Sequence, residues 1–194
     1  MLKEKLQDYN LILASGSPRR QQFFSDLELD FTIQLKEVEE IFPNHLKGKE
    51  ITEFLAQLKA SAFTALKNKD ILITADTIVW HNGKMLGKPK NEAEAIEMIK
   101  GLSGKKHKVF SSVCIKSNRK ELVFSDTTVV RFKKLSDEEI RYYVKNFKPL
   151  DKAGSYGIQE WIGLIGVKSI KGSYFNVMGF PVHKFYKEIT NFLS

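Results

Sequence analysis

The chain has 194 residues, of which 42% are hydrophobic and 28% charged, a composition typical of a globular protein. This length suits one domain, or two small lobes that share a core. No apolar run is long enough to cross a bilayer, and the first ten residues lack the apolar core of a signal peptide. The single cysteine, Cys114, excludes an intramolecular disulfide. We therefore expect a cytoplasmic protein.

The chain is basic, with 31 Lys and Arg against 23 Asp and Glu and a net charge of +8. A basic protein of this kind could bind nucleic acid, an anionic membrane surface or a small polyanionic substrate. The basic residues are spread along the chain and match no nucleic-acid-binding motif, so the charge alone does not choose between these partners. The four histidines lack the spacing of zinc ligands, and no zinc site is expected.

The first half of the chain predicts two strands and two helices. Pro18 suits the first turn of a helix that Ser17 would cap. A longer helix is indicated by an apolar stripe that runs from Ile51 to Leu66. The expected strands cover residues 9–14 and 31–35, and the expected helices cover residues 18–27 and 50–67.

The second half adds a hairpin to an alternation of strands and helices. A buried strand at 71–75 continues extended to Trp80 and reaches the turn signal His81-Asn82-Gly83. Asn91 with Glu94, and Ser136 with Glu139, have the spacing of capping boxes. Helices are expected at 92–102, 136–146 and 182–192, and strands at 108–115, 122–132 and 164–170. These elements predict an α/β fold with a mixed sheet, and no linker divides residues 1–194 into separate domains.

The turn at residues 15–20, SGSPRR, is a candidate anion site. A short Ser/Gly turn that leads into a helix presents free backbone N–H groups at the positive end of the helix dipole. Ser15 and Ser17 add hydroxyls, and the guanidinium groups of Arg19 and Arg20 suit phosphate oxygens. An ordinary capped helix with two surface arginines explains the same residues equally well.

Asp76 follows the strand ILITA, and ligands of open α/β sheets bind at the carboxyl ends of strands. This position makes its carboxylate a candidate metal ligand or general base, although a turn-forming Asp is an equal alternative. An acidic cluster, Glu37, Glu39 and Glu40, could share a magnesium ion with it. Three acids in a loop are more often solvent-exposed.

Three lysines are further candidates for ligand contact. Lys59 lies beside the apolar stripe of the long helix and could point into a cleft, although a surface lysine whose stem packs on the core is commoner. Lys88 and Lys152 lie in loops with small neighbours that allow a ligand to approach closely. Each of the three is weak evidence by itself.

Several motifs follow one another over nearly the whole chain: LILASGSPRR, EVEE, LAQLKA, ITADTIVW, LGKP, LSGKKHKV, DKAGSYGIQ and GSYFNVMGFP. In this order they resemble the motifs of the Maf family of nucleotide pyrophosphatases. LILASGSPRR is similar to the family's opening signature, and EVEE and LAQLKA are similar to its acidic loop and helix lysine. The resemblance implies a mixed, twisted sheet flanked by helices, with two lobes around a cleft, as in inosine-triphosphate pyrophosphatases.

The resemblance also implies residue roles. Asp76 corresponds to the proton acceptor, and Glu40, Lys59 and Lys88 belong to the metal and phosphate site. The turn residues Ser15, Arg19 and Arg20 correspond to phosphate ligands. The metal would be Mg²⁺ or Mn²⁺, bound by Glu40 and Asp76.

The motifs SPRR, ADT and GIQ are similar to the branch of the family that acts on dTTP and UTP. That branch implies specificity roles for Arg19, Thr77 and Gln159. Lys152 joins these residues as a candidate substrate contact. A homodimer is compatible with the resemblance, and nucleic acid is not expected as a partner.

The chain departs from the family pattern at three places. Ser111-Ser112 stands where Thr-Gly is usual, and Glu160-Trp161 follows GIQ where Gly is common. The acidic loop reads Val-Glu-Glu instead of Val-Asp-Glu.

The expected activity is hydrolysis of dTTP and UTP to the monophosphate and pyrophosphate. Two alternatives remain: the same reaction on a modified purine such as 7-methyl-GTP, and a nucleotide-binding or nucleic-acid-binding regulator of cell division without turnover. Several acids that converge on phosphates argue against pure binding, because acids repel phosphate unless a metal intervenes.

Overall fold

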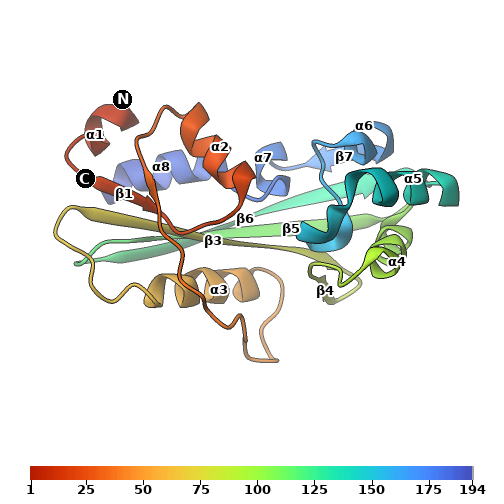
Figure 1. The fold of residues 1–194 in the computed structure, drawn as a ribbon, viewed down its shortest axis with the longest axis horizontal. Helices are drawn as coiled ribbons and strands as arrows, with labels where there is room; N and C mark the ends of the chain where they lie inside the picture. Colours follow the sequence, from red (N-terminus) through yellow and green to blue (C-terminus); the bar gives the residue numbers. More distant parts are fainter. Residues whose placement is uncertain (194) are drawn as a thin grey trace. The chain divides into compact units, whose positions relative to one another are not determined.

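The computed structural model describes residues 1–193 as helices flanking a mixed β-sheet (Figure 1). The hydrogen-bonded strand order is β2-β1-β3-β5-β6-β7, with β4 on β3. The strands are β1 (Asn10–Leu13), β2 (Thr32–Ile33), β3 (Asp70–His81), β4 (Lys84–Leu86), β5 (Lys106–Lys116), β6 (Glu121–Phe132) and β7 (Val167–Lys171). The α-helices are α1 (Leu2–Leu6), α2 (Pro18–Asp26), α3 (Lys49–Ser61), α4 (Glu92–Leu102), α5 (Asp137–Phe147), α6 (Trp161–Gly166), α7 (Tyr174–Val177) and α8 (Val182–Phe192).

The chain divides into two compact units. Unit 1 contains residues 1–76, 111–126 and 179–194, and unit 2 contains residues 77–110 and 127–178. The sheet is mixed because β1 pairs parallel with β2 and β3, whereas β3–β4 and β6–β7 are antiparallel. The predicted fold class is confirmed in this respect. A cleft between two lobes stays a prediction.

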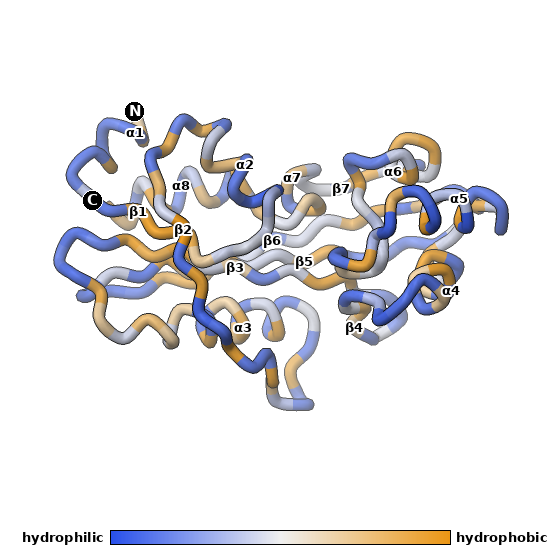
Figure 2. Tube along the Cα trace, viewed as in Figure 1, coloured by the Kyte–Doolittle hydropathy of each residue, from blue (hydrophilic) through white to orange (hydrophobic). Residues whose placement is uncertain are grey.

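Unit 1 is built on the parallel strands β1 and β3. In their paired part, residues 11–13 of β1 and 71–73 of β3 are all apolar, and the tube is mostly hydrophobic around β1 (Figure 2). On one side, α3 packs Ala56 and Ala60 against Ile12 and Leu72. On the other side, α2 and α8 meet through aromatic contacts of Phe24 with Phe180 and Phe185. Unit 1 thus has a sheet covered by helices on both faces (Figure 1).

Unit 2 has its own core around α4, α5 and α6. The buried side chains come from all three helices and from the strands beneath them, and include Val79, Ile99, Tyr143, Ile158 and Ile162. The segment between α5 and α6 contains two 3₁₀ turns and contributes Tyr156 and Ile158 to this core. That segment, which carries the motif DKAGSYGIQ, is therefore fixed by packing.

Two helix N-caps and a hairpin turn that were predicted from short local motifs are confirmed. The Asn91 side chain accepts a hydrogen bond from the Glu94 amide, and Ser136 and Glu139 form a capping box on α5. Asn82 and Gly83 both have positive φ, as a two-residue hairpin turn requires. The predicted bounds of α2, α4 and α8 are confirmed to within one residue.

Three predicted elements were wrong in extent. The helix expected at 50–67 ends at Ser61, because Phe63 and Leu66 reach the same core from an irregular segment instead of from a helix face. The strand expected at 31–35 covers two residues. Residue Leu164, expected in a strand, lies in α6, and β7 begins at Val167. The short helices α1, α6 and α7 had no periodic signal long enough to predict.

A search for membrane spans among the described residues finds no helix that combines the required length and hydropathy.

Candidate functional site

Asp76 lies within β3, not at its end as the sequence suggested. The parallel partner β1 pairs with residues 70–73 of β3 and ends at Leu13, where the chain turns toward α2. Asp76 therefore follows the point where the parallel pair of strands ends, while β3 itself continues to His81. Asp76 thus lies just beyond the carboxyl end of β1, whereas the sequence predicted that it lies at the carboxyl end of its own strand.

Lys59 of α3 contacts the Asp76 carboxylate. Its Nζ donates to Asp76 Oδ1 at 2.7 Å and lies 3.0 Å from Glu40 Oε1. The contact follows from the packing of α3 on β3, because Thr74 Oγ1 donates to the Ala56 carbonyl at 2.6 Å. Lys59 is one helical turn after Ala56, and Asp76 is two residues after Thr74 on the same face of the strand. The buried hydrogen bond between Thr74 and Ala56 thus brings Lys59 and Asp76 into register.

The second oxygen of Asp76 is differently placed. Asp76 Oδ2 is buried and has no hydrogen-bond partner among residues 1–193. A buried carboxylate oxygen without a partner is costly, and such an atom in a native structure suggests a role in binding or catalysis. Lys59 therefore orients one oxygen of the carboxylate and leaves the other able to accept.

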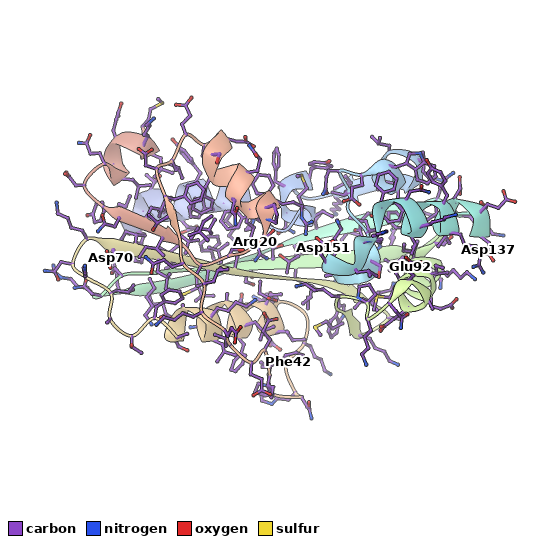
Figure 3. The ribbon with its side chains drawn as sticks, in the orientation of Figure 1. Arg20, Phe42, Asp70, Glu92, Asp137 and Asp151 are labelled. Carbon is purple, nitrogen blue, oxygen red and sulfur yellow. The ribbon has the colours of Figure 1, made fainter. Side chains whose placement is uncertain are left out.

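Arg20 of α2, labelled in Figure 3, is anchored to the backbone of Ala75, the residue before Asp76. Its Nη1 donates to the Ala75 carbonyl at 3.0 Å and to Ser15 Oγ at 3.4 Å, and its Nε donates to the Gly179 carbonyl at 2.9 Å. Removal from water lowers the pKa of Arg20, and the nearby Asp76 carboxylate opposes that shift. The guanidinium thus places a positive charge next to the peptide that carries Asp76.

The turn before α2 is held by Ser15. Its hydroxyl oxygen accepts from the Ser17 amide at 3.3 Å, and its carbonyl accepts from the Gln21 side chain at 3.1 Å. Ser17 occupies the N-cap position, but its side chain makes no capping hydrogen bond. Arg19, the next residue of the motif, is half-buried on α2.

The acidic loop brings one of its three carboxylates to Lys59. Glu40 makes the ion pair with Lys59, although its side chain remains 54% exposed. Glu37 and Glu39 are exposed in the same irregular segment. Of the three acids, Glu40 was the residue that the motif resemblance singled out.

The remaining predicted residues, Thr77, Lys88, Lys152 and Gln159, belong to unit 2. Lys88 is exposed in the loop after β4, and Thr77 follows Asp76 in β3. Lys152 is buried, with its Nζ 2.7 Å from Asp151 Oδ1 and 3.1 Å from Glu160 Oε1. Gln159 Oε1 is buried and has no hydrogen-bond partner among the residues described.

Two residues that were not among the predicted site residues, Tyr143 and Glu160, interact at the segment that carries Gln159. Tyr143 donates to Glu160 Oε2 and accepts from the Gly157 amide at 3.0 Å. Glu160 was noticed as a departure from the family pattern, which was the available signal. Nothing in the sequence pointed to Tyr143, since a tyrosine on an amphipathic helix is normally a core residue.

The carboxylates of unit 1 fit a hard divalent cation. Among residues 1–193 no group of three or more His, Cys, Asp or Glu side chains could enclose a metal ion. Magnesium, however, usually takes one or two carboxylates and completes its shell with water and substrate phosphates. Asp76, with its unpartnered buried oxygen, and Glu40 supply that donor set.

Known proteins are similar to this chain in sequence, and one solved structure is similar in fold. The model of the family described as Maf-like protein matches residues 10–192. The chain is 60% identical to a protein named dTTP/UTP pyrophosphatase from Flavobacterium johnsoniae, over 98% of each chain. It is 55% identical to one of the same name from Christiangramia forsetii, over the full length of both. A solved structure of a HAM1 protein from Coxiella burnetii is similar in fold, with a TM-score of 0.52 and 14% identity, over 94% of this chain and 99% of that one.

Proposed function

Because the chain belongs to the Maf family, we propose that it is a nucleoside triphosphate pyrophosphatase that hydrolyses dTTP and UTP to dTMP or UMP and pyrophosphate. The names of the full-length relatives at 55–60% identity support the activity and the substrates. The observation in the structure that carries the proposal is the Asp76 carboxylate, with one oxygen on Lys59 and the other buried without a partner.

Asp76 is the proposed general base. Oδ1 is engaged by the Lys59 ammonium at 2.7 Å, so the carboxylate cannot rotate without losing that bond. Oδ2 then accepts a hydrogen bond or a proton from the attacking water. A base must lie within hydrogen-bond reach of the proton it takes, and a fixed carboxylate meets that condition better than a mobile one.

Glu40 and Asp76 are the proposed ligands of Mg²⁺ or Mn²⁺. When bound, such a cation neutralises phosphate charge and stabilises the leaving pyrophosphate. Without a cation, two carboxylates would repel a triphosphate. Lys59 lies between these two carboxylates and offsets part of their charge.

The turn residues Ser15, Arg19 and Arg20, together with Lys88, are the proposed phosphate contacts. Arg20 already donates to two carbonyls and the Ser15 hydroxyl, so its main contribution is a fixed positive charge beside Asp76. The net charge of +8 favours the approach of a substrate with about four negative charges. Lys152 stays a predicted substrate contact, and its two carboxylate partners favour an indirect role.

Gln159 is the residue proposed to recognise the base. Thr77 and Arg19 are the other two residues proposed to contribute to base specificity. A glutamine amide offers one acceptor oxygen and two N–H donors. It can therefore accept from N3–H of uracil or thymine and donate to a neighbouring carbonyl. The buried Oε1 without a partner among the described residues supplies the acceptor.

Base preference tests this proposal. Values of kcat/KM for dTTP and UTP should exceed those for GTP and ATP. Gln159→Ala should reduce that preference about 5- to 150-fold, since a bidentate amide–base pair contributes about 1–3 kcal/mol of discrimination. Discrimination against CTP should be weaker, because the amide can rotate to present the opposite order of donor and acceptor. Equal rates on purines and pyrimidines, or an unchanged preference in the variant, would exclude Gln159 from the base site.

Hydrolysis of a modified purine such as 7-methyl-GTP is the second candidate, and adding 7-methyl-GTP to the same substrate panel tests it. A regulator that binds nucleotides without turnover is the third, and it predicts binding with no product. A cytoplasmic location and a homodimer remain expectations of the sequence.

A further inference from the structure

The segment at residues 157–160 is a tight turn with Gln159 at its third position. The Glu160 amide donates to the Gly157 carbonyl at 3.0 Å, which closes the turn. Ile158 is 4% exposed and packs in the core of unit 2. Gln159 therefore extends from a turn that is fixed by one backbone hydrogen bond and one buried neighbour.

Tyr143 of α5 holds both ends of this turn. Its side chain is fully buried, and its hydroxyl accepts from the Gly157 amide at 3.0 Å and donates to Glu160 Oε2. The directions are set by chemistry, because an amide can only donate and a carboxylate can only accept. Burial and the hydrogen bond to Glu160 raise the pKa of Tyr143, so the hydroxyl keeps the proton that it donates.

Glu160 has a second anchor in Lys152. Its Oε1 lies 3.1 Å from Lys152 Nζ, and Lys152 is itself buried and paired with Asp151. Both carboxylate oxygens are thus engaged by groups from two different segments of unit 2. Charge-assisted hydrogen bonds of this kind are stronger than neutral ones and fix geometry.

Two glycines leave room for this arrangement. A Cβ on Gly157 would lie 2.7 Å from the Glu160 carboxyl carbon, and a Cβ on Gly163 would lie 1.8 Å from the Ile158 carbonyl oxygen. Real Cβ contacts are never this short, so the peptide between Ile158 and Gln159 lies directly against α6. The turn thus contacts α5 through Tyr143 and α6 through Gly163.

We propose that Tyr143 and Glu160 are positioning residues for the base preference, and that they act by holding the turn from which Gln159 reads the pyrimidine. This inference rests on the proposed function, in which Gln159 contacts the base. Neither residue needs to touch the substrate. Their hydrogen bonds keep the buried Gln159 oxygen in one place before the nucleotide binds, which lowers the ordering cost of recognition.

The test measures the ratio of kcat/KM for dTTP to that for GTP in the full chain. Tyr143→Phe removes both hydroxyl bonds, and Glu160→Gln removes the charge while it keeps the shape. Each variant should lower the ratio about tenfold, mainly through a higher KM for dTTP, as expected when a fixed polar contact becomes mobile. Glu160→Gln serves alone if Tyr143→Phe does not fold.

Tyr156→Phe is the matched control. Tyr156 is also buried in unit 2, but its hydroxyl bonds to His107 Nε2 at 2.6 Å and not to the turn. This variant loses a buried hydroxyl of the same kind and should keep the wild-type ratio. A merely structural role of Tyr143 would instead make Tyr143→Phe and Tyr156→Phe alike.

Gln159→Ala distinguishes a failure of the positioning role of Tyr143 and Glu160 from a failure of the base-reading role of Gln159. If Gln159→Ala lowers the ratio and Tyr143→Phe adds no further loss in the double variant, the positioning role is supported, because residues that act through one group are non-additive. If Gln159→Ala lowers the ratio but Tyr143→Phe and Glu160→Gln keep it, the positioning role is wrong and the base-reading role stands. If Gln159→Ala keeps the ratio, both fail.

Discussion

Asp76→Asn should lower kcat about 10²- to 10⁴-fold for dTTP, since loss of a general base costs a factor of this size. The substitution keeps the shape of the side chain but removes the charge that Lys59 contacts at 2.7 Å and the proton-accepting capacity of Oδ2. Loss of a metal ligand would add to the effect. Steady-state rates with excess Mg²⁺ measure it, and circular dichroism shows whether the fold is kept.

Asp70→Asn is the control for this substitution. Asp70 is another buried carboxylate of β3, 8% exposed, and it accepts from Asn10 Nδ2 at 3.0 Å and from the Lys67 amide at 2.9 Å. Its loss should affect the free energy of unfolding but leave kcat near the wild-type value. An Asp76→Asn enzyme that keeps more than about a tenth of the wild-type rate, well outside the expected loss, would contradict the assignment.

Lys59→Met should lower kcat/KM for dTTP about 10²- to 10³-fold, which is the usual effect of removing one preorganised donor from a charged site. Methionine keeps the aliphatic stem of the helix residue but removes the ammonium between Asp76 Oδ1 and Glu40 Oε1. Two effects then combine: the Asp76 carboxylate loses the contact that fixes it, and the carboxylates repel the phosphates more strongly.

Lys116→Met provides the comparison for Lys59→Met. Lys116 is also a half-buried lysine of unit 1, and its Nζ donates to the Ala60 carbonyl at 3.3 Å and lies 3.6 Å from Glu121. Its replacement should leave the kinetic constants within about twofold of the wild type, as for a substitution away from the site. Equal losses in both variants would mean that Lys59 acts through stability.

The fold could be predicted where local chemistry was specific. The Asn91 and Ser136 caps and the Asn82-Gly83 turn each satisfy backbone groups within four residues, so their effect does not depend on the rest of the chain. The end of α3 could not be predicted in this way. Its apolar stripe continues in sequence through Phe63, but that side chain reaches the core from a segment that is no longer helical.

The candidate site was predictable only in part. Residue identities came from the ordered motifs, whereas the contact of Lys59 with Asp76 depends on the hydrogen bond between Thr74 and Ala56, which no motif records. Arg20 was expected to bind phosphate, and its bonds to the Ala75 and Gly179 carbonyls depend on segments more than 50 residues away in sequence. The role of Tyr143 could not be predicted from the sequence, because its hydroxyl contacts Gly157 and Glu160, which lie in a turn later in the chain.

The identity of the two products of dTTP hydrolysis tests the proposed activity most directly. The purified chain is incubated with dTTP and Mg²⁺, and separately with Mn²⁺ or with a chelator, while pyrophosphate and orthophosphate are measured side by side. We expect dTMP and pyrophosphate in equal amounts, formed only when the divalent cation is present. Orthophosphate with dTDP, or binding of dTTP without either product, would contradict the proposed function.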